Sequence, residues 1–241
     1  MRLFAISDLH LSFGVDKPMD IFGPQWVGHA EKIREAWDST VAPEDWVLVG
    51  GDTSWGLNLA EARPDLDWLG ERPGRKVLIK GNHCTWWGSL AKVRAVLHPS
   101  IHPLQNDAVR LDDEFVVLGG RLWDPPDAPW AEPGAEKIFR REIERLKLSI
   151  AAADTLGPAR RIALIHYPPR FTDGRITEAV PLLEAAGVEW CIYGHLHGRE
   201  HHKLGFQGEA GGIRYLLTAC DAIDFAPVVV PLAGPGGVAD R

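Results

Sequence analysis

The chain has 241 residues, of which 45% are hydrophobic and 24% are charged, and its formal net charge is −7. A chain of this length can bury one substantial core, so we expect a single domain. Its acidity and its lack of any lysine or arginine cluster argue against binding to long nucleic acids or to anionic membranes. A small anionic substrate is compatible with this charge if bound metal ions reverse it locally.

The cysteines and the first residues of the chain indicate a compartment. Cys84, Cys191 and Cys220 are odd in number and widely spaced, which favours reduced thiols over disulfides. Met1 leads directly into an apolar run, and no stretch approaches the roughly 18 consecutive apolar residues that a membrane span needs. We therefore expect a soluble cytoplasmic protein.

In the first half of the chain, short apolar runs typical of buried strands alternate with helical or irregular segments. The strand-like runs occupy residues 3–6, 46–49 and 77–80, and helices are expected over 26–39, 57–63 and 86–97, with a further helical piece and a turn over 64–74. Pro99 cannot continue the third helix. Residues 109–111 and 115–118, separated by three acidic residues, predict an antiparallel hairpin.

The second half continues the alternation. Residues 123–133 hold four prolines and two tryptophans and predict an ordered but irregular loop. A helix follows with one apolar stripe, and another over 176–186 should end at Gly187. The stripe is formed by Phe139, Ile143, Leu146 and Ile150, and strands are expected over 162–165, 190–193, 214–218 and 228–230. We place the domain at residues 1–232 and expect the glycine-rich residues 233–241 to be a flexible tail.

Alternating strands and helices predict an α/β protein whose sheets are flanked by helices, and ligands in such folds collect beyond the carboxyl ends of the strands. Five of the strand-like runs lead into side chains that can bind metal ions or phosphate. These side chains are Asp8 and His10, Asp52, Asn82 and His83, His166, and His195 and His197. We expect all of them to meet at one rim of the molecule.

The chemistry of these side chains predicts two metal ions. Carboxylate and amide oxygens together with imidazole nitrogens suit Mn or Fe, with Zn also possible, and they exclude a soft thiolate site. Seven candidate ligands are more than one tetrahedral ion needs. A carboxylate can bridge two ions, and a pair about 4 Å apart can activate a shared hydroxide and hold the oxygens of a phosphoryl group.

The motifs Asp8-Leu9-His10, Gly51-Asp52, Gly81-Asn82-His83, His166 and Gly194-His195-Leu196-His197 occur in that order, each behind an apolar run. Each motif alone is weak, but together they resemble the calcineurin-like metallophosphoesterases, including the predicted phosphohydrolases of bacteria. The resemblance covers nearly the whole chain. It implies a four-layer α-β-β-α sandwich, in which helices flank two mixed sheets and a dinuclear metal site lies at one edge.

The resemblance also implies a role for each residue. Asp8, His10 and His197 would bind the first ion, Asn82, His166 and His195 would bind the second, and Asp52 would bridge them. His83 would contact the substrate phosphate and protonate the leaving oxygen. A metal-bridging hydroxide would then hydrolyse a small phosphomonoester or phosphodiester.

One position departs from the family pattern. The family usually has an acidic residue after the Asn-His pair, where it can fix the tautomer of the histidine, and this chain has Cys84. We interpret Cys84 as a small buried side chain. Asp221 or Asp224 could supply the missing carboxylate, although surface aspartates in a turn are the favoured interpretation of both.

Residues outside the motifs carry weaker signals. His201 and His202 could line a substrate cleft, and Arg121 and Arg170 could contact a phosphate. The tryptophans near the rim, Trp55, Trp86, Trp87, Trp123 and Trp130, are mostly expected to fill the core, although one or two could stack on an organic group. Two alternatives stay open: a dinuclear metallohydrolase of a non-phosphate substrate, and a non-catalytic metal-binding scaffold.

Overall fold

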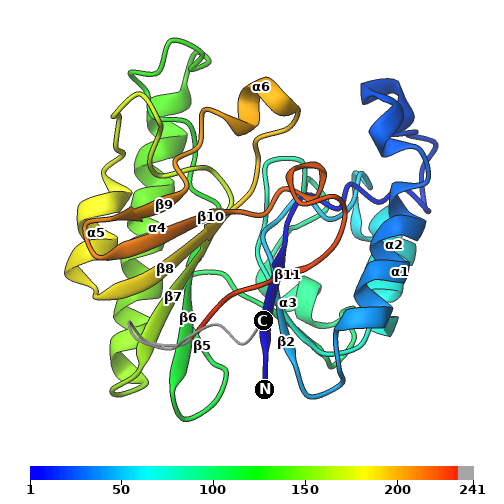
Figure 1. Cartoon of the computed structure of the whole chain (residues 1–241), viewed down its shortest axis with the longest axis horizontal. Helices are drawn as coiled ribbons and strands as arrows, with labels where there is room; N and C mark the ends of the chain where they lie inside the picture. The colour runs from blue at the N-terminus through cyan, green and yellow to red at the C-terminus, as the bar shows by residue number, and fades with distance from the viewer. Residues whose placement is uncertain (233–241) are drawn as a thin grey trace.

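The computed structural model describes residues 1–232 and shows two β-sheets that face each other, with helices on their outer sides (Figure 1). The first sheet has the strand order β11-β1-β2-β3-β4. Its strands are β1 (Leu3–Ile6), β2 (Trp46–Val49), β3 (Arg75–Leu78), β4 (Ile101–Pro103) and β11 (Val228–Val229). The strands β1 to β4 are parallel, and β11 pairs antiparallel with β1, so the sheet is mixed.

The second sheet has six strands in the order β5-β6-β7-β8-β10-β9. They are β5 (Val109–Arg110), β6 (Phe115–Gly120), β7 (Arg160–Ile165), β8 (Val188–Tyr193), β9 (Gly208–Ala210) and β10 (Ile213–Leu217). The four central strands are parallel, while β5 and β9 pair antiparallel at the two edges. The hairpin expected from the sequence is therefore present as β5 and β6.

The helices make the two outer layers. The helices α1 (His29–Thr40), α2 (Leu59–Glu71) and α3 (Leu90–Arg94) pack on the first sheet, whereas α4 (Ala135–Thr155) and α5 (Ala179–Ala185) cover the second. Short helical turns lie in the loops: η1 (Asp20–Phe22), η2 (Pro24–Trp26), α6 (Arg199–His202) and η3 (Cys220–Ala222). Buried side chains such as Leu48 and Ile192 fill the space between the sheets. The predicted α-β-β-α sandwich is confirmed.

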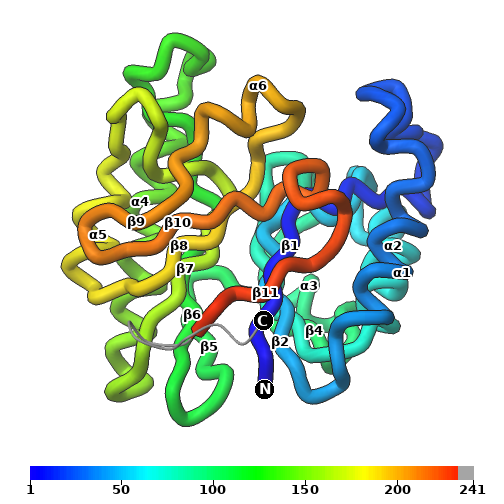
Figure 2. The backbone as a smooth tube through the Cα atoms, in the orientation of Figure 1, coloured from blue at the N-terminus to red at the C-terminus, as the bar shows by residue number. Residues whose placement is uncertain are grey.

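The tube view shows how the chain moves between the two halves (Figure 2). Residues up to β4 build the first sheet, residues from β5 to β10 build the second, and the chain then returns so that β11 lies beside β1. In the loop after β10, a bridge pairs Ser7 with Ala219. This return brings the segment around Cys220 to the carboxyl end of β1.

Four helix predictions differ from the structure, and one of them is the helix expected over 176–186, which is present as the shorter α5. The sequence predicts a helix that ends at Arg63, but α2 continues past Pro64 without a break. The side chain of Asn58 caps this helix by accepting hydrogen bonds from amides of its first turn, and the apolar face of the helix continues beyond the proline. The helix expected over 86–97 is reduced to α3, since Trp86 and Trp87 are buried in the preceding loop. The helix expected over 26–39 begins later, after the turn η2. The predicted tail at 233–241 lies outside the described residues.

Lys76 is a fully buried lysine in β3, and it predicts a pH dependence of stability. Its Nζ donates to the carbonyls of Gly70 and Arg72 and to Ser100 Oγ. Burial lowers the pKa of Lys76 from 10.5 to about 8. The unfolded chain therefore binds this proton more tightly than the folded chain, so the free energy of unfolding should rise between these two pH values by up to about 3 kcal/mol.

Urea unfolding of the wild type and of Lys76→Met at about pH 7.5 and about pH 10 measures this effect. The wild type should gain stability relative to the variant as the pH rises. A difference between the two proteins that is the same at both pH values would contradict the assignment.

Candidate metal centre

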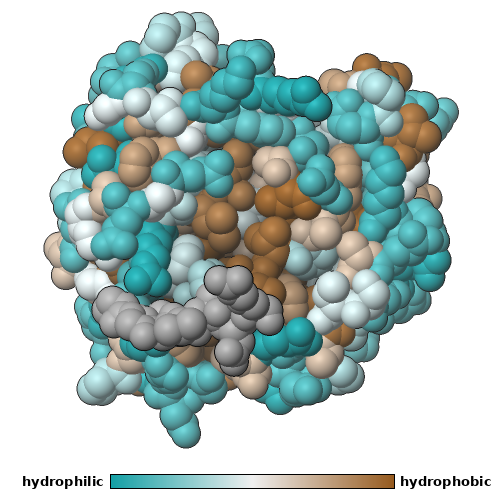
Figure 3. Space-filling model, in the orientation of Figure 1, coloured by the Kyte–Doolittle hydropathy of each residue, from teal (hydrophilic) through white to brown (hydrophobic). Residues whose placement is uncertain are grey.

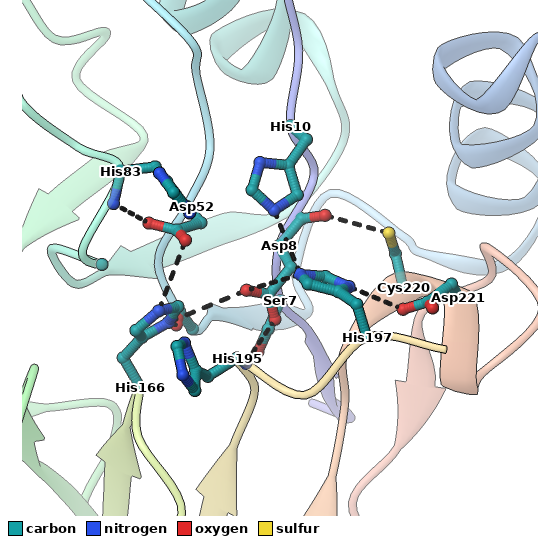
Figure 4. A network of polar contacts seen from close by, with 12 residues as sticks. Ser7, Asp8, His10, Asp52, His83, His166, His195, His197, Cys220 and Asp221 are labelled. Atoms are coloured by element: carbon teal, nitrogen blue, oxygen red, sulfur yellow. Dashed lines mark hydrogen bonds and ion pairs between the residues drawn. The ribbon is translucent and has the colours of Figure 1, made fainter. Parts of the chain in front are cut away.

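The site lies at the edge of the molecule where the parallel strands of both sheets end (Figure 4). All seven predicted metal ligands and His83 are found there. Asp8 and His10 follow β1, Asp52 follows β2, Asn82 and His83 follow β3, His166 follows β7, and His195 and His197 follow β8. Parallel strands direct their carboxyl ends to the same edge, which is why residues so far apart in sequence converge.

The backbone at this edge is strained. Only eight non-glycine residues among 1–232 have positive φ, and four of them are Asp8 (61°), His10 (47°), Asp52 (46°) and His195 (72°). This conformation is unfavourable for residues with a side chain and is retained where the surrounding structure enforces it. The strain is therefore concentrated in the loops that direct these four side chains toward one another.

Two glycines of the motifs make the close approach possible. A Cβ atom on Gly81 would lie 2.0 Å from Asp52 Oδ1, and one on Gly194 would lie 2.2 Å from Asp8 Oδ2. Both distances are far shorter than a van der Waals contact. Any larger residue at either position would displace a carboxylate of the site.

Asp8, His10 and His197 form the first group that could hold a cation, with their ligand atoms within 4.8 Å of one another. His10 Nε2 lies 3.1 Å from His197 Nε2, and His197 Nε2 lies 3.6 Å from Asp8 Oδ1. Asp8 Oδ1 is buried and has no hydrogen-bond partner among residues 1–232. A buried carboxylate oxygen without a partner is costly, and a cation would satisfy it.

The second group lies around His166 and shares Asp8 with the first. Asp8, Asp52 and His166 again have ligand atoms within 4.8 Å of one another. His166 Nδ1 donates to the carbonyl of Gly50 at 2.9 Å, so its Nε2 faces the site, 3.4 Å from Asp52 Oδ2. Asn82 Oδ1 lies 2.7 Å from His166 Nε2 and 3.0 Å from His195 Nδ1. These oxygen and nitrogen atoms match the ligands of a second cation.

The pKa shifts in the cluster go in both directions: burial lowers the pKa of His10 and of His195 well below 6.5, whereas Asp52 and His197 favour their charged forms. Burial alone would raise the pKa of Asp52, but His166 and His10 hold it well below the usual value of 3.8. Burial would lower the pKa of His197, yet its hydrogen bond with Asp221 and the nearby negative charge of Asp8 raise it to about 10. The donor set of two carboxylates, one amide oxygen and four imidazoles suits the dinuclear centre that the sequence resemblance implies.

His83 lies at the rim of this cluster. Its backbone amide donates to Asp52 Oδ1 at 2.8 Å, and its ring packs 4.6 Å from the ring of Trp55. The His83 imidazole makes no hydrogen bond with another residue of the described chain. The His83 ring is therefore positioned by packing against Trp55 and not by a hydrogen bond to a carboxylate.

Cys84 is completely buried, as expected from the sequence. Burial raises the pKa of its thiol to about 12, which makes it a neutral group and a poor metal ligand. Its Sγ accepts from the amide of Gly81 at 3.3 Å and lies 3.9 Å from Asp52 Oδ1. The residue that replaces the usual acid thus contacts Asp52 and makes no hydrogen bond with His83.

Asp221 corrects the sequence analysis. Its side chain is only 2% exposed, so the interpretation as a surface turn residue is wrong, and it does not contact His83. Its Oδ1 accepts from His197 Nδ1 at 2.8 Å, while its Oδ2 accepts from the amide of Gly198 at 2.8 Å and from His202 Nε2 at 3.1 Å. Asp221 therefore fixes the tautomer of His197 so that Nε2 faces the site. Asp224, by contrast, is exposed.

The other candidates have mixed outcomes. Arg121 pairs with the buried Glu142 at 2.8 Å, and Arg170 lies 3.9 Å from Glu184, so both are engaged by carboxylates. Trp86 and Trp87 fill the core. His202 binds Asp221, whereas His201 lines two cavities next to the cluster, one of which contains Trp55 and the other Trp130.

Comparisons with known proteins agree with this geometry. A family model described as calcineurin-like phosphoesterase matches residues 1–199. The Gene 66 proteins of Mycobacterium phages D29 and L5 are 38% and 39% identical to this chain over 202 and 201 residues. These matches cover 80% and 79% of this chain and 77% and 75% of the phage proteins.

Two solved structures have a similar fold. Phosphopantetheinyl hydrolase from Mycobacterium tuberculosis has a TM-score of 0.56 at 15% identity, with 98% of both chains covered. The protein TT1561 of Thermus thermophilus has a TM-score of 0.54 at 16% identity, with 95% of this chain and 88% of that chain covered. The family match over most of the chain accounts for the carboxylates and imidazoles that meet at the sheet edge. The chain belongs to the calcineurin-like phosphoesterase family, whose activity is metal-dependent hydrolysis of phosphoesters.

Proposed function

We propose that this protein hydrolyses a small phosphoester with two metal ions bound at the sheet edge. Asp8, His10 and His197 would bind one ion. Asn82, His166 and His195 would bind the other, with Asp52 between the two ions. The observation that carries the proposal is the convergence of carboxylate, amide and imidazole ligand atoms on one cluster, with Asp8 Oδ1 left without a hydrogen-bond partner among residues 1–232.

When bound, the ion pair would activate water and stabilise the negative charge that develops on the phosphoryl oxygens. The chain itself would supply the remaining steps. His83 is the histidine at the rim of the cluster that is not a predicted ligand, and it would donate a proton to the oxygen of the leaving group. Trp55 would hold the His83 ring toward the substrate, and Asp221 would keep His197 Nε2 directed at its ion.

We propose manganese or iron as the metals, with zinc also compatible with these ligands. The described residues contain no helix that is both long enough and apolar enough to cross a bilayer. The three cysteines are buried and unpaired, which supports a reducing compartment such as the cytoplasm. The acidity of the chain and the limited size of its cavities support a small substrate rather than a long nucleic acid.

Asp221→Asn should weaken metal binding about 10–100-fold, which is the usual effect of removing a carboxylate that orients a metal-bound histidine. The variant keeps the shape of the side chain but weakens the hydrogen bond with His197 Nδ1. Calorimetric titration of the metal-free protein with Mn²⁺ measures the change. Asp224→Asn is the matched control, because Asp224 is exposed and lies outside the cluster. Equal affinities of the two variants would contradict the role of Asp221.

Hydrolysis assays test the proposed function directly. The protein is stripped of metal with a chelator, reloaded with Mn²⁺, and assayed with a generic aryl phosphodiester and the matching monoester. Turnover should depend on the added metal and should be lost in Asp52→Asn. Absence of turnover of both substrates by metal-loaded protein would contradict the proposal.

A further inference from the structure

Among the cavities formed by residues 1–232, one is lined by the proposed ligands His10 and His197 and another by His195, and α6 lies between the loops that enclose these two (Figure 1). The first, which we call the lysine cavity, measures about 550 Å³ and is lined by Lys17, Met19, Phe22, Trp26, Trp55 and His83, among others. The second, which we call the tryptophan cavity, measures about 310 Å³ and is lined by Asp124, Trp130, Phe171, His195, Leu196 and Leu204, among others. His201 lines both, so the two spaces flank the same segment of the site.

The lysine cavity is placed to receive a leaving group. His83, the proposed proton donor, lines this cavity and not the other. Lys17 Nζ lies 3.5 Å from the centre of the Trp55 ring, which gives the wall a cation held over an aromatic surface. Phe22 of this lining is 55% exposed and its neighbour Ile21 is 69% exposed. Hydrophobic residues reach the surface at the upper right of Figure 3. An organic arm with polar or anionic character fits this space.

The tryptophan cavity has a different character. Its lining within residues 1–232 contains no lysine or arginine, and its carboxylate, Asp124, accepts a hydrogen bond from Trp130 Nε1 at 2.9 Å. The rings of Trp130 and Phe171 lie 5.6 Å apart and form an aromatic wall. The cavity meets the metal centre at His195. Arg175 lies over the Trp130 ring, 4.5 Å from its centre, but its guanidinium pairs with the carboxylate of Asp173 and does not line the cavity. The lining therefore suits an aromatic or apolar group.

We propose that the substrate is a phosphodiester whose two organic arms occupy these two cavities. This inference rests on the proposed function and extends it to a substrate class. Water would form a new bond to phosphorus, the bond from phosphorus to the arm in the lysine cavity would break, and that arm would leave as an alcohol after His83 protonates its oxygen. The product in the tryptophan cavity would be a phosphomonoester that keeps the aromatic or apolar arm. A monoester substrate has one arm and would leave one cavity unfilled.

Three probes with the same leaving group test this arrangement in the Mn²⁺-loaded protein: bis(4-nitrophenyl) phosphate, methyl 4-nitrophenyl phosphate and 4-nitrophenyl phosphate. We expect kcat/KM to be highest for the bis-aryl diester, because only that probe fills both cavities. In Trp130→Ala the ratio of bis-aryl to methyl diester activity should fall about 2–10-fold, the usual value of one aromatic contact. Trp130 is 40% exposed, so its loss should leave the fold intact.

Two further variants serve as controls. Phe22→Ala alters the lysine cavity and should lower activity on both diesters by the same factor, which leaves the ratio as in the wild type. Leu148→Ala removes an exposed leucine of α4 and should change neither activity. Leu204→Ala is a second change in the tryptophan cavity and should lower the ratio in the same direction as Trp130→Ala.

The outcomes separate the two proposals. Turnover of the monoester in preference to both diesters, or an unchanged ratio in both tryptophan-cavity variants, would overturn the diester assignment and leave the phosphoesterase assignment standing. Failure of the metal-loaded protein to turn over any of the three probes would overturn both.

Discussion

Replacement of His83 with glutamine is expected to lower kcat about 10²–10⁴-fold for a phosphoester with a poor leaving group, because general acid catalysis contributes an effect of this size. The loss should be much smaller for a 4-nitrophenyl ester, whose anion departs without a proton. The measurement is kcat for an alkyl ester and for a 4-nitrophenyl ester of otherwise matched structure. The metal content of His83→Gln should equal that of the wild type, since His83 is not a proposed ligand.

His98→Gln is a suitable control for this experiment, because His98 is exposed and its ring contacts Ser100 rather than the cluster. Equal losses in His83→Gln for both leaving groups would show that the residue does not act as the acid. Loss of metal from His83→Gln would instead show that its ring helps to build the centre.

Replacing a residue that only orients a metal ligand lowers activity by at most about 100-fold. Asp52→Asn is expected to lower activity by more than this, because it removes a charge from the proposed bridging position. The side chain is 1% exposed and lies 3.4 Å from His166 Nε2, so the variant changes charge with little change in shape. Elemental analysis should find fewer ions per chain than in the wild type. Asp67→Asn, which alters an exposed carboxylate of α2, should bind metal and turn over substrate as the wild type does.

An Asp52→Asn variant that keeps two ions and full activity would show that Asp8 holds both ions without it. Asp8 is the residue to consider in this role, because it belongs to both groups of candidate ligands in the structure. The family resemblance had assigned Asp8 to the first ion alone.

Much of the fold could be predicted from local sequence. The runs at residues 3–6 and 46–49 are buried strands because every side chain in them is apolar, and only a strand covered on both faces accommodates that pattern. Helix boundaries were harder to predict. Pro64 lies inside α2 because packing of the apolar face outweighs the lost hydrogen bond, and Trp86 stays outside α3 because its ring is buried in the loop. Both outcomes depend on tertiary contacts that propensity does not include.

The site could be predicted to the extent that its residues follow strands. Asp52 and Asn82 come directly after parallel strands, so their convergence follows from the order of the sheet. Asp221 was missed as a partner of His197 because it lies 24 residues further along the chain, in a turn whose position depends on the pairing of Ser7 with Ala219. The two cavities could not be predicted either, because segments distant in sequence, such as those around Lys17 and His197, form their walls together.

A crystal structure of the Mn²⁺-loaded protein with anomalous-scattering data would test the central claim most directly. We predict two ions about 3.5–4 Å apart, with the carboxylate of Asp52 between them, one ion bound by His10 and His197 and the other by Asn82 and His166. A single ion, or ions bound only outside this cluster, would contradict the account.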